Sequence, residues 1–188
     1  MKRALSILCA AILIAVNGSA AMRDNQRLRD YQHRVIGKPA VARAAAGAAV
    51  GQLRNVPHEW GQGAGGFAKR FGSHLAQHAV KETIQLGVGA WHHEDLHYQR
   101  SNLQGTWPRM KYAVKSTFIV PRTNRPGKTF ALGRVSGNLG AGLISRAWQP
   151  ASTAGIGAGL ASGGIGLGAD VGIHVAREFW PRRPIARR

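Results

Sequence analysis

The sequence predicts a mainly α protein, in which a single glycine-rich helical domain follows a signal peptide. Three observations predict this fold class. Apolar residues recur at helical spacing from Phe67 to Trp91, and glycines recur at four-residue intervals within 133–137 and 155–172. Strict alternation of apolar residues with small or polar ones, which is typical of a strand, is confined to residues 165–175. A β-rich outer-membrane barrel therefore stays open as the alternative fold.

Residues 1–21 have the three parts of a secretory signal peptide. Lys2 and Arg3 supply the charged start, residues 4–16 form an apolar run, and residues 17–21 offer small side chains for cleavage. The apolar run is too short for a permanent membrane-spanning helix. We therefore expect an exported bacterial protein of the periplasm or outer envelope. Cys9 is the only cysteine and lies inside this signal, so the mature chain has no disulfide and no thiol nucleophile.

The rest of the chain divides into a flexible polar lead (22–38), the helical domain (39–181) and a basic tail (182–188). Glycine-rich residues 61–66 and turn-rich residues 121–127 are expected to be loops. The apolar and alanine-rich segments between such breaks, most of them expected to be helical, cover 40–54, 67–91, 107–120, 130–148 and 151–179.

The chain carries a formal charge of +18 at neutral pH, and its charges are unevenly placed. No acidic residue occurs between Asp95 and Asp170, although this window holds nine lysines and arginines. Such cations attract anionic lipids or other envelope polyanions, and nucleic acid is a poorer partner for an exported protein. The alternative is a solvated basic surface. The candidate residues for binding an anionic surface are Arg109, Lys111, Lys115, Arg122, Arg125, Lys128, Arg182, Arg183, Arg187 and Arg188.

Glycines at four-residue spacing make a smooth helix face on which another helix can approach closely, within one chain or in a homo-oligomer. Each glycine also costs a helix about 1 kcal/mol relative to alanine, so close packing or a membrane must stabilise the segment. Residues 151–169 are uncharged and long enough to span a bilayer, but hold few large apolar residues. The candidate packing residues are Gly133, Gly137, Gly155, Gly159, Gly163, Gly164, Gly168 and Gly172.

Residues 93–97 match the pattern H-E-x-x-H. On a helix, His93 and His97 would share one face and could hold zinc, while Glu94 would activate water. The chain lacks the third ligand of the extended pattern, because position 103 is Leu103. The simpler interpretation is that residues 92–98 end a helix in a polar, hydrogen-bonded junction.

Several strings resemble an uncharacterised family of small exported, glycine-rich bacterial proteins. The resemblance covers roughly residues 56–181 and implies no activity. It also implies that the His-Glu-Asp string is a structural corner. The strings that carry it are Glu59–Gly63, Gly66–Ser73, His93–Asp95, Gly137–Gly142, Ile144–Ser145 and Glu178–Pro181.

From these observations we expect an envelope protein with a structural or interaction role, without enzymatic activity or a cofactor. Its helices would pack through glycines, and its cations would face anionic envelope surfaces at a membrane. Two alternatives remain: a zinc-dependent hydrolase that uses His93, His97 and Glu94, and a small outer-membrane barrel.

Overall fold

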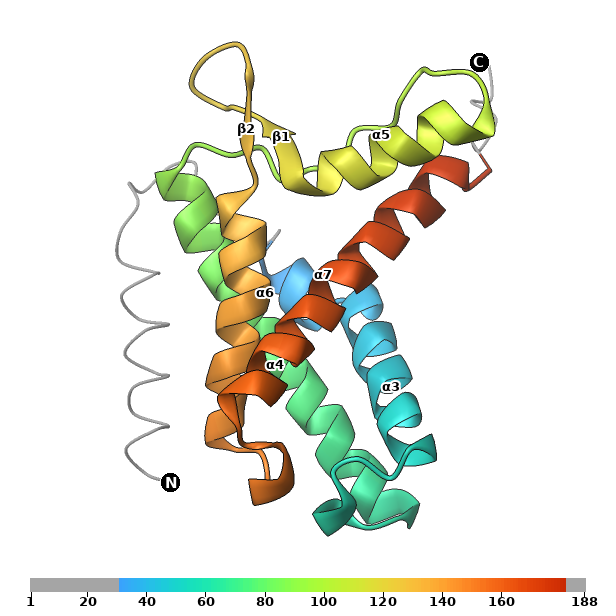
Figure 1. Ribbon diagram of the computed structural model, residues 1–188, viewed down its shortest axis with the longest axis vertical. Helices are drawn as coiled ribbons and strands as arrows, with labels where there is room; N and C mark the ends of the chain where they lie inside the picture. The colour runs from blue at the N-terminus through green and yellow to red at the C-terminus, as the bar shows by residue number, and fades with distance from the viewer. Residues whose placement is uncertain (1–30, 182–188) are drawn as a thin grey trace.

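The computed structural model describes residues 31–181 and shows a mainly α fold (Figure 1). The signal peptide and the basic tail that the sequence predicts lie outside the described residues. A short helical stretch at 31–36 comes first. The elements that follow are α3 (Lys38–Leu53), η1 (His58–Trp60), α4 (Gly63–Trp91), α5 (Thr106–Phe118), β1 (Ile119–Pro121), β2 (Lys128–Phe130), α6 (Leu132–Ile144), η2 (Ser145–Ala147), η3 (Ala151–Thr153) and α7 (Ile156–Phe179).

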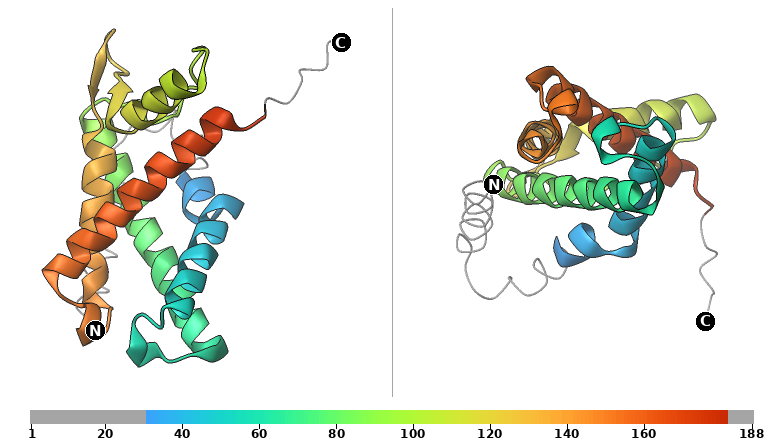
Figure 2. Two further views of the ribbon diagram at one scale, coloured as in Figure 1. Left: turned by 45° about the vertical axis from the view of Figure 1, so that its right-hand side comes forward. Right: turned by 90° about the horizontal axis from the view of Figure 1, so that it is seen from below.

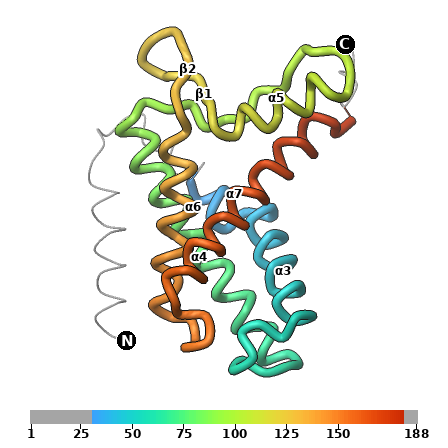
Figure 3. Tube along the Cα trace, viewed as in Figure 1, coloured from blue at the N-terminus to red at the C-terminus, as the bar shows by residue number. Residues whose placement is uncertain are grey.

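The long helix α4 is the centre of the arrangement. It packs against α3 on one side and α6 on another, and α7 crosses α6 at an angle (Figure 1). The α3–α4 turn lies at one end of the molecule, whereas α5 and the β1–β2 hairpin lie at the other end (Figure 2). The Cα trace in Figure 3 shows the C-terminal part of α7 rising to meet the start of α5.

The barrel alternative is wrong. The described residues contain one two-stranded antiparallel sheet, in which Ile119 pairs with Phe130. Residues 165–175 lie inside α7 despite their alternating pattern. In a helix the side chains of these residues project on all sides of the axis. Among them, α7 buries only the polar residues Asp170 and His174. The alternation therefore arises from the spacing of small residues.

Two expected loops are partly helical. Residues 31–36 were expected in a flexible lead but form a helix, with the Tyr31 hydroxyl 2.6 Å from Thr83 Oγ1 on α4. The glycine-rich loop 61–66 is also shorter than expected, since α4 begins at Gly63. Position 66, in the first turn of α4, has no room for a side chain, because a Cβ there would lie 2.9 Å from the Trp60 carbonyl oxygen.

The interior is built from small and polar side chains. Among residues 31–181, the buried apolar side chains are six alanines, Val80 and Val120. The largest fully buried side chains are Arg70, Glu178, Thr117 and Ser145. Many large apolar side chains are exposed instead, including Ile156 at 74% and Ile165 at 72%. Close backbone packing and hydrogen bonds therefore hold this fold more than burial of large apolar groups does.

Four of the eight candidate packing glycines lie where two helices touch. A Cβ at Gly133 would lie 2.8 Å from the Gly89 nitrogen of α4, and one at Gly137 would lie 2.9 Å from the Lys81 oxygen. Gly159 and Gly163 contact α6, where a Cβ at Gly163 would lie 2.8 Å from the Leu139 Cα. These contacts leave no room for a side chain.

The other four candidate glycines make no such contact. Around the position of a Cβ at Gly155, Gly164, Gly168 or Gly172, no described atom lies within 4 Å apart from the adjoining backbone of the same segment. The structure therefore corrects the prediction that these four glycines pack helices of this chain together, because no neighbouring helix contacts them. Packing through them in a homo-oligomer stays a prediction.

A buried ion pair joins α4, α6 and α7 at the point where the three helices meet. Lys81 Nζ lies 2.8 and 2.7 Å from the two carboxylate oxygens of Asp170, and the Asn138 amide donates to Asp170 at 2.9 Å. All three residues are at least nine-tenths buried. Burial alone would raise the pKa of Asp170, but Lys81 and Asn138 outweigh it and hold that pKa below its ordinary value.

By length and composition, α7 is apolar enough to cross a membrane, a criterion that core helices of soluble proteins also meet. Only 17% of its most apolar window is buried. The helix extends beyond the expected 151–169 and includes Asp170, His174 and Glu178 on its buried face.

Candidate functional site

Helix α5 presents a basic and aromatic face to solvent. Trp107, Lys111, Val114 and Lys115 are exposed and fall four, three and one residues apart, which places them on one side of a helix. The Lys111 ammonium lies 5.1 Å from the centre of the Trp107 ring, within the range of a cation–π interaction. The opposite side buries Ala113 and Thr117 in the molecule. The exposed face therefore has no structural partner within the described chain.

The β1–β2 hairpin extends this basic surface at the same end of the molecule (Figure 1). Arg125 and Lys128 are exposed, and Phe130 on β2 is 46% exposed. Arg122 differs, because it is half-buried and donates to the Thr129 hydroxyl at 3.3 Å. Two of the three candidate cations of the hairpin therefore face solvent.

Apolar and aromatic side chains are exposed where α5 begins and α7 ends. Leu103 is 50% exposed, Trp180 is 70% exposed, and Phe179 is 38% exposed. The remaining candidate cations, Arg182, Arg183, Arg187 and Arg188, follow Trp180 in the sequence but lie outside the described residues. We call the exposed residues of this end, Leu103, Trp107, Lys111, Val114, Lys115, Arg125, Lys128, Phe130 and Trp180, the basic end.

Arg109 was expected on the anion-binding surface, and the structure corrects this. Its Nε lies 3.2 Å from Glu178 Oε1, and its guanidinium lies 4.6 Å from the centre of the Phe179 ring. The guanidinium also donates to the Glu178 carbonyl. Arg109 therefore joins α5 to α7 and is not free to bind a ligand.

Glu178 is the centre of the polar contact between α5 and α7. It is 1% exposed and accepts hydrogen bonds from the Tyr98 hydroxyl at 2.6 Å and the Ser101 backbone nitrogen at 3.1 Å. The Ser101 hydroxyl also donates to it. Burial alone would raise the pKa of Glu178, but these donors and Arg109 lower it to about 2. Glu178 is therefore ionised at neutral pH.

One turn earlier on α7, His174 is buried between α5 and the Tyr98 ring. Its Nδ1 lies 2.9 Å from Thr117 Oγ1, and its ring stacks on Tyr98 with the centres 4.5 Å apart. Burial and the nearby Arg134 guanidinium lower the pKa of His174 to about 4. The imidazole is therefore neutral at neutral pH. Burial and the Glu178 carboxylate raise the pKa of Tyr98.

The H-E-x-x-H residues form a corner after α4 and not a helix. α4 ends at Trp91, and His93 has a left-handed backbone with φ of 56°. The Glu94 side chain is fully buried, where it accepts hydrogen bonds from the Gly133 nitrogen at 3.1 Å and from His92 Nδ1 at 2.8 Å. Gly133 lies in the first turn of α6, so the carboxylate stabilises the positive end of that helix.

This geometry removes the basis of the zinc-hydrolase hypothesis. Residues 93–97 are not helical, so the two histidines do not share a helix face, and Glu94 points to α6. His97 is exposed and pairs with Asp95 at 3.1 Å. Within residues 31–181, no three histidine or acidic side chains are grouped so that they could hold a metal ion.

Sequence reasoning missed the cluster of Tyr98, Ser101, His174 and Glu178. One signal could have indicated it. The chain has only eight acidic residues, and Asp170 and Glu178 stand alone in its basic C-terminal half. Eight residues are slightly more than two helical turns, so the two carboxylates lie on one broad face of a helix, and this face is the candidate for pairing with the chain's excess of cations.

Comparisons of the chain with protein-family models, curated proteins and solved structures found no match.

Proposed function

We propose that this protein has a structural or interaction role at the bacterial envelope and binds an anionic membrane surface through the basic end. The observation that carries the proposal is the exposure of Lys111, Lys115, Arg125 and Lys128 together with Trp107 and Trp180. Lysine and arginine near an anionic membrane contribute about 1 kcal/mol each, and tryptophan favours the membrane–water interface.

The charge balance supports this partner. From Arg100 to Ala169 the sequence has no carboxylate side chain, so none along this stretch neutralises the exposed cations. The nearest acidic residues along the chain are engaged elsewhere: Asp95 accepts from the His97 backbone nitrogen at 3.0 Å, and Asp170 is paired with Lys81 at 2.7 Å. An anionic surface would therefore meet uncompensated positive charge at the basic end.

The polar interior also supports a location beside a membrane. Helices that contact lipid pack through small residues and bury their ionisable groups in pairs, as Gly163 and the Lys81–Asp170 pair do here. The outer face of α7 exposes Ile156, Leu160 and Ile165. Covering such an exposed apolar face with lipid or with another apolar surface is favourable, because it removes the apolar side chains from water.

Co-sedimentation with vesicles tests the proposal. We expect binding to phosphatidylcholine vesicles that contain phosphatidylglycerol, and little binding to phosphatidylcholine alone. Binding should weaken strongly between about 50 and 500 mM salt, because salt screens exposed charges. The double variant Lys111→Gln/Lys115→Gln should bind about 10- to 30-fold more weakly, since it loses two membrane-facing charges.

A matched control removes the same charge elsewhere. Lys38 and Arg54 are exposed on and just after α3, away from the basic end. Lys38→Gln/Arg54→Gln should therefore bind anionic vesicles nearly as well as the wild type. Equal binding to neutral and anionic vesicles would contradict the proposal, as would an equal loss in both double variants.

A further inference from the structure

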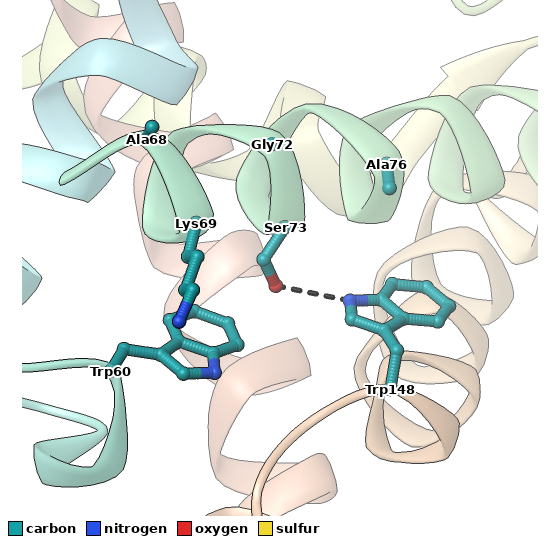
Figure 4. A pocket seen from close by; sticks show the side chains of 7 residues that line it. All are labelled: Trp60, Ala68, Lys69, Gly72, Ser73, Ala76 and Trp148. Atoms are coloured by element: carbon teal, nitrogen blue, oxygen red, sulfur yellow. Dashed lines mark hydrogen bonds between the residues drawn. The ribbon is translucent and has the colours of Figure 1, made fainter. Parts of the chain in front are cut away.

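A groove with two tryptophan walls lies at the end of the molecule opposite the basic end. Trp60, from η1, and Trp148, which follows η2, lie along the same side of α4 and face its Lys69–Ala76 stretch (Figure 4). The groove has a volume of about 270 Å³, and its lining is mostly apolar. The lining residues are Trp60, Ala68, Lys69, Gly72, Ser73, Ala76 and Trp148.

A buried arginine fixes the turn that carries Trp60. Arg70 is 1% exposed and donates to the carbonyl oxygens of Val56 at 2.9 Å, Pro57 at 2.8 Å and Gly61 at 2.8 Å. Its Nη1 also donates to Gln52 at 2.7 Å. These acceptors come from both sides of Trp60, so the position of the first indole is set by the fold.

A second arginine fixes the turn that carries Trp148. Arg146 donates to the Gly142 carbonyl at 3.1 Å, the Ser145 hydroxyl at 2.8 Å and the Thr153 carbonyl at 2.6 Å. The Trp148 indole nitrogen donates to Ser73 on α4 at 3.0 Å, which orients the second ring. The two walls are thus held before any ligand binds, which reduces the entropy cost of binding.

The floor of the groove is a strip of α4 without large side chains. Ala68, Gly72 and Ala76 are four residues apart and lie on one helix face. Around a Cβ position at Gly72, no described atom lies within 4 Å apart from the adjoining backbone of α4. The floor therefore leaves the space between the indoles open.

Two polar groups in the groove have unused hydrogen-bonding capacity. Ser73 is 8% exposed, and its oxygen accepts from Trp148 Nε1 at 3.0 Å and from Gln149 Nε2 at 2.9 Å. Both acceptor sites are used, but its own hydroxyl hydrogen has no acceptor in the described chain. Lys69 extends from α4 towards Trp60 (Figure 4) and makes no ion pair with any described residue.

We propose that this groove binds a small carboxylate that carries a flat ring. The ring would lie between the Trp60 and Trp148 indoles over Gly72, because aromatic faces attract flat rings. The carboxylate would accept from the Lys69 ammonium and the free Ser73 hydroxyl, and a charge-assisted hydrogen bond is stronger than a neutral one. This site is separate from the basic end, so either can fail without the other.

The groove is large enough for a ring. A cavity of about 150 Å³ holds one benzene molecule. The volume of about 270 Å³ therefore has room for one ring system with a short acidic arm, and the groove is open to solvent on one side. A ligand of this size has a Kd on the order of 1 mM, a value that calorimetry and NMR can measure.

The test titrates the full-length chain with phenylacetate and indole-3-acetate, and with phenylacetamide, acetate and glucuronate for comparison. We expect the two aromatic acids to bind and acetate to bind at least about 10-fold more weakly, because acetate lacks the ring. Phenylacetamide should also bind at least about 5-fold more weakly, since it lacks the charge. Binding of glucuronate without the aromatic acids would overturn the flat-ring assignment, as would equal binding of acid and amide.

Paired variants locate the binding. Gly72→Leu fills the floor, whereas Gly87→Leu places the same side chain in open space farther along α4. Both replace an exposed helical glycine at which a Cβ meets no neighbouring element, so both should fold. Gly72→Leu should abolish binding of phenylacetate, and Gly87→Leu should leave it unchanged.

A second pair of variants tests the charge. Lys69→Gln should weaken binding of the acid about 5-fold and leave binding of the amide unchanged, and Lys38→Gln should affect neither. Binding that survives Gly72→Leu would overturn the proposal.

Discussion

The two halves of α7 hold the helix in place by different means. In the first half, Gly159 and Gly163 let the backbone of α7 touch that of α6, and a Cβ at Gly163 would lie 2.8 Å from Leu139 Cα. In the second half, Asp170, His174 and Glu178 are buried and bond to Lys81, Thr117 and Tyr98 across distances of 2.6 to 2.9 Å. Backbone contact holds the first half, and side-chain hydrogen bonds hold the second.

The difference shows how a chain with few buried large apolar residues can still specify one arrangement. Backbone contact at glycine requires a match of shape, because any added atom meets a neighbouring helix. Buried carboxylates require particular donors, since an unpaired buried charge costs several kcal/mol. The two halves should therefore respond to different substitutions.

The largest loss of stability is expected when the Lys81–Asp170 ion pair, at the boundary between the two halves of α7, is broken. Lys81→Met leaves the Asp170 carboxylate buried without its cation, so the free energy of unfolding should fall by about 3–5 kcal/mol. Urea unfolding measures this loss. The double variant Lys81→Met/Asp170→Leu should recover most of it, because an apolar pair can replace a buried ion pair. A single variant as stable as the wild type would show that the pair does not hold the helices together.

In the second half, Glu178→Gln removes the charge that four donors share. The free energy of unfolding should fall by about 2–3 kcal/mol, since hydrogen bonds to a charged group are the stronger kind. Glu59→Gln makes the same chemical change at an exposed carboxylate that bonds Ser152 at 2.8 Å, and should change stability much less. Equal losses in the two variants would contradict the role of Glu178.

In the first half of α7, alanine substitutions at two neighbouring glycines should change the free energy of unfolding in opposite directions. Gly163→Ala places a Cβ against the backbone of α6 and should lower the free energy of unfolding by about 2 kcal/mol. Gly164→Ala places the same atom in open space and should raise it by about 1 kcal/mol through helix propensity. Thermal or urea unfolding measures both. Equal effects would mean that α7 is rotated about its axis relative to the structure.

A further effect concerns pH, to which His174 of the second half contributes together with His74 and His78 of α4, whose pKa values burial also lowers. The pKa of His174 is lowered from 6.5 to about 4, so the unfolded chain takes up this proton more readily than the folded one. Stability should therefore fall as pH drops from 6.5 towards 4, because the unfolded state binds more protons there. The lowered pKa of Glu178 adds a further loss between 4.5 and about 2. Unfolding free energies measured across this range report both losses.

Replacement of the imidazole separates His174 from other groups. His174→Gln should reduce the pH dependence of stability between pH 6.5 and 4 and leave the part that His74 and His78 contribute, whereas His58→Gln, at a side chain that is 69% exposed, should retain all of it. An unchanged pH dependence in His174→Gln would assign the loss to another group.

Helical periodicity predicted the existence of α4, α5 and α7 within a few residues. It could not predict which glycines touch a neighbour, since Gly163 and Gly164 both belong to four-residue series. The large apolar residues of α7 predict the wrong orientation of this helix. Leu160 and Ile165 lie beside the glycines that no neighbouring helix contacts, so a prediction that buries apolar residues would turn the wrong face of α7 towards the molecule. Only the positions of α4 and α6 decide between the two series.

The sites depend on pairings between distant parts of the chain. Lys81 and Asp170 are 89 residues apart, and Tyr98 and Glu178 are 80 apart. The charge pattern predicted an uncompensated basic surface but not that Arg109 is used inside the molecule. Similarly, the H-E-x-x-H string gave no sign that Glu94 stabilises the start of α6. Local sequence indicates which chemical groups are present, and tertiary structure decides what each group meets.

The central claim, that the basic end contacts an anionic membrane, is tested most directly with a polarity-sensitive probe at single sites. A Cys9→Ser chain is free of cysteine, so one introduced cysteine can carry a nitrobenzoxadiazole label. Val114 on α5 is 39% exposed, and Leu53 at the C-terminal end of α3 is 87% exposed. With vesicles containing phosphatidylglycerol, the account predicts blue-shifted, brighter emission from a label at position 114 and little change at position 53. No shift at position 114, or the same shift at both positions, would contradict it.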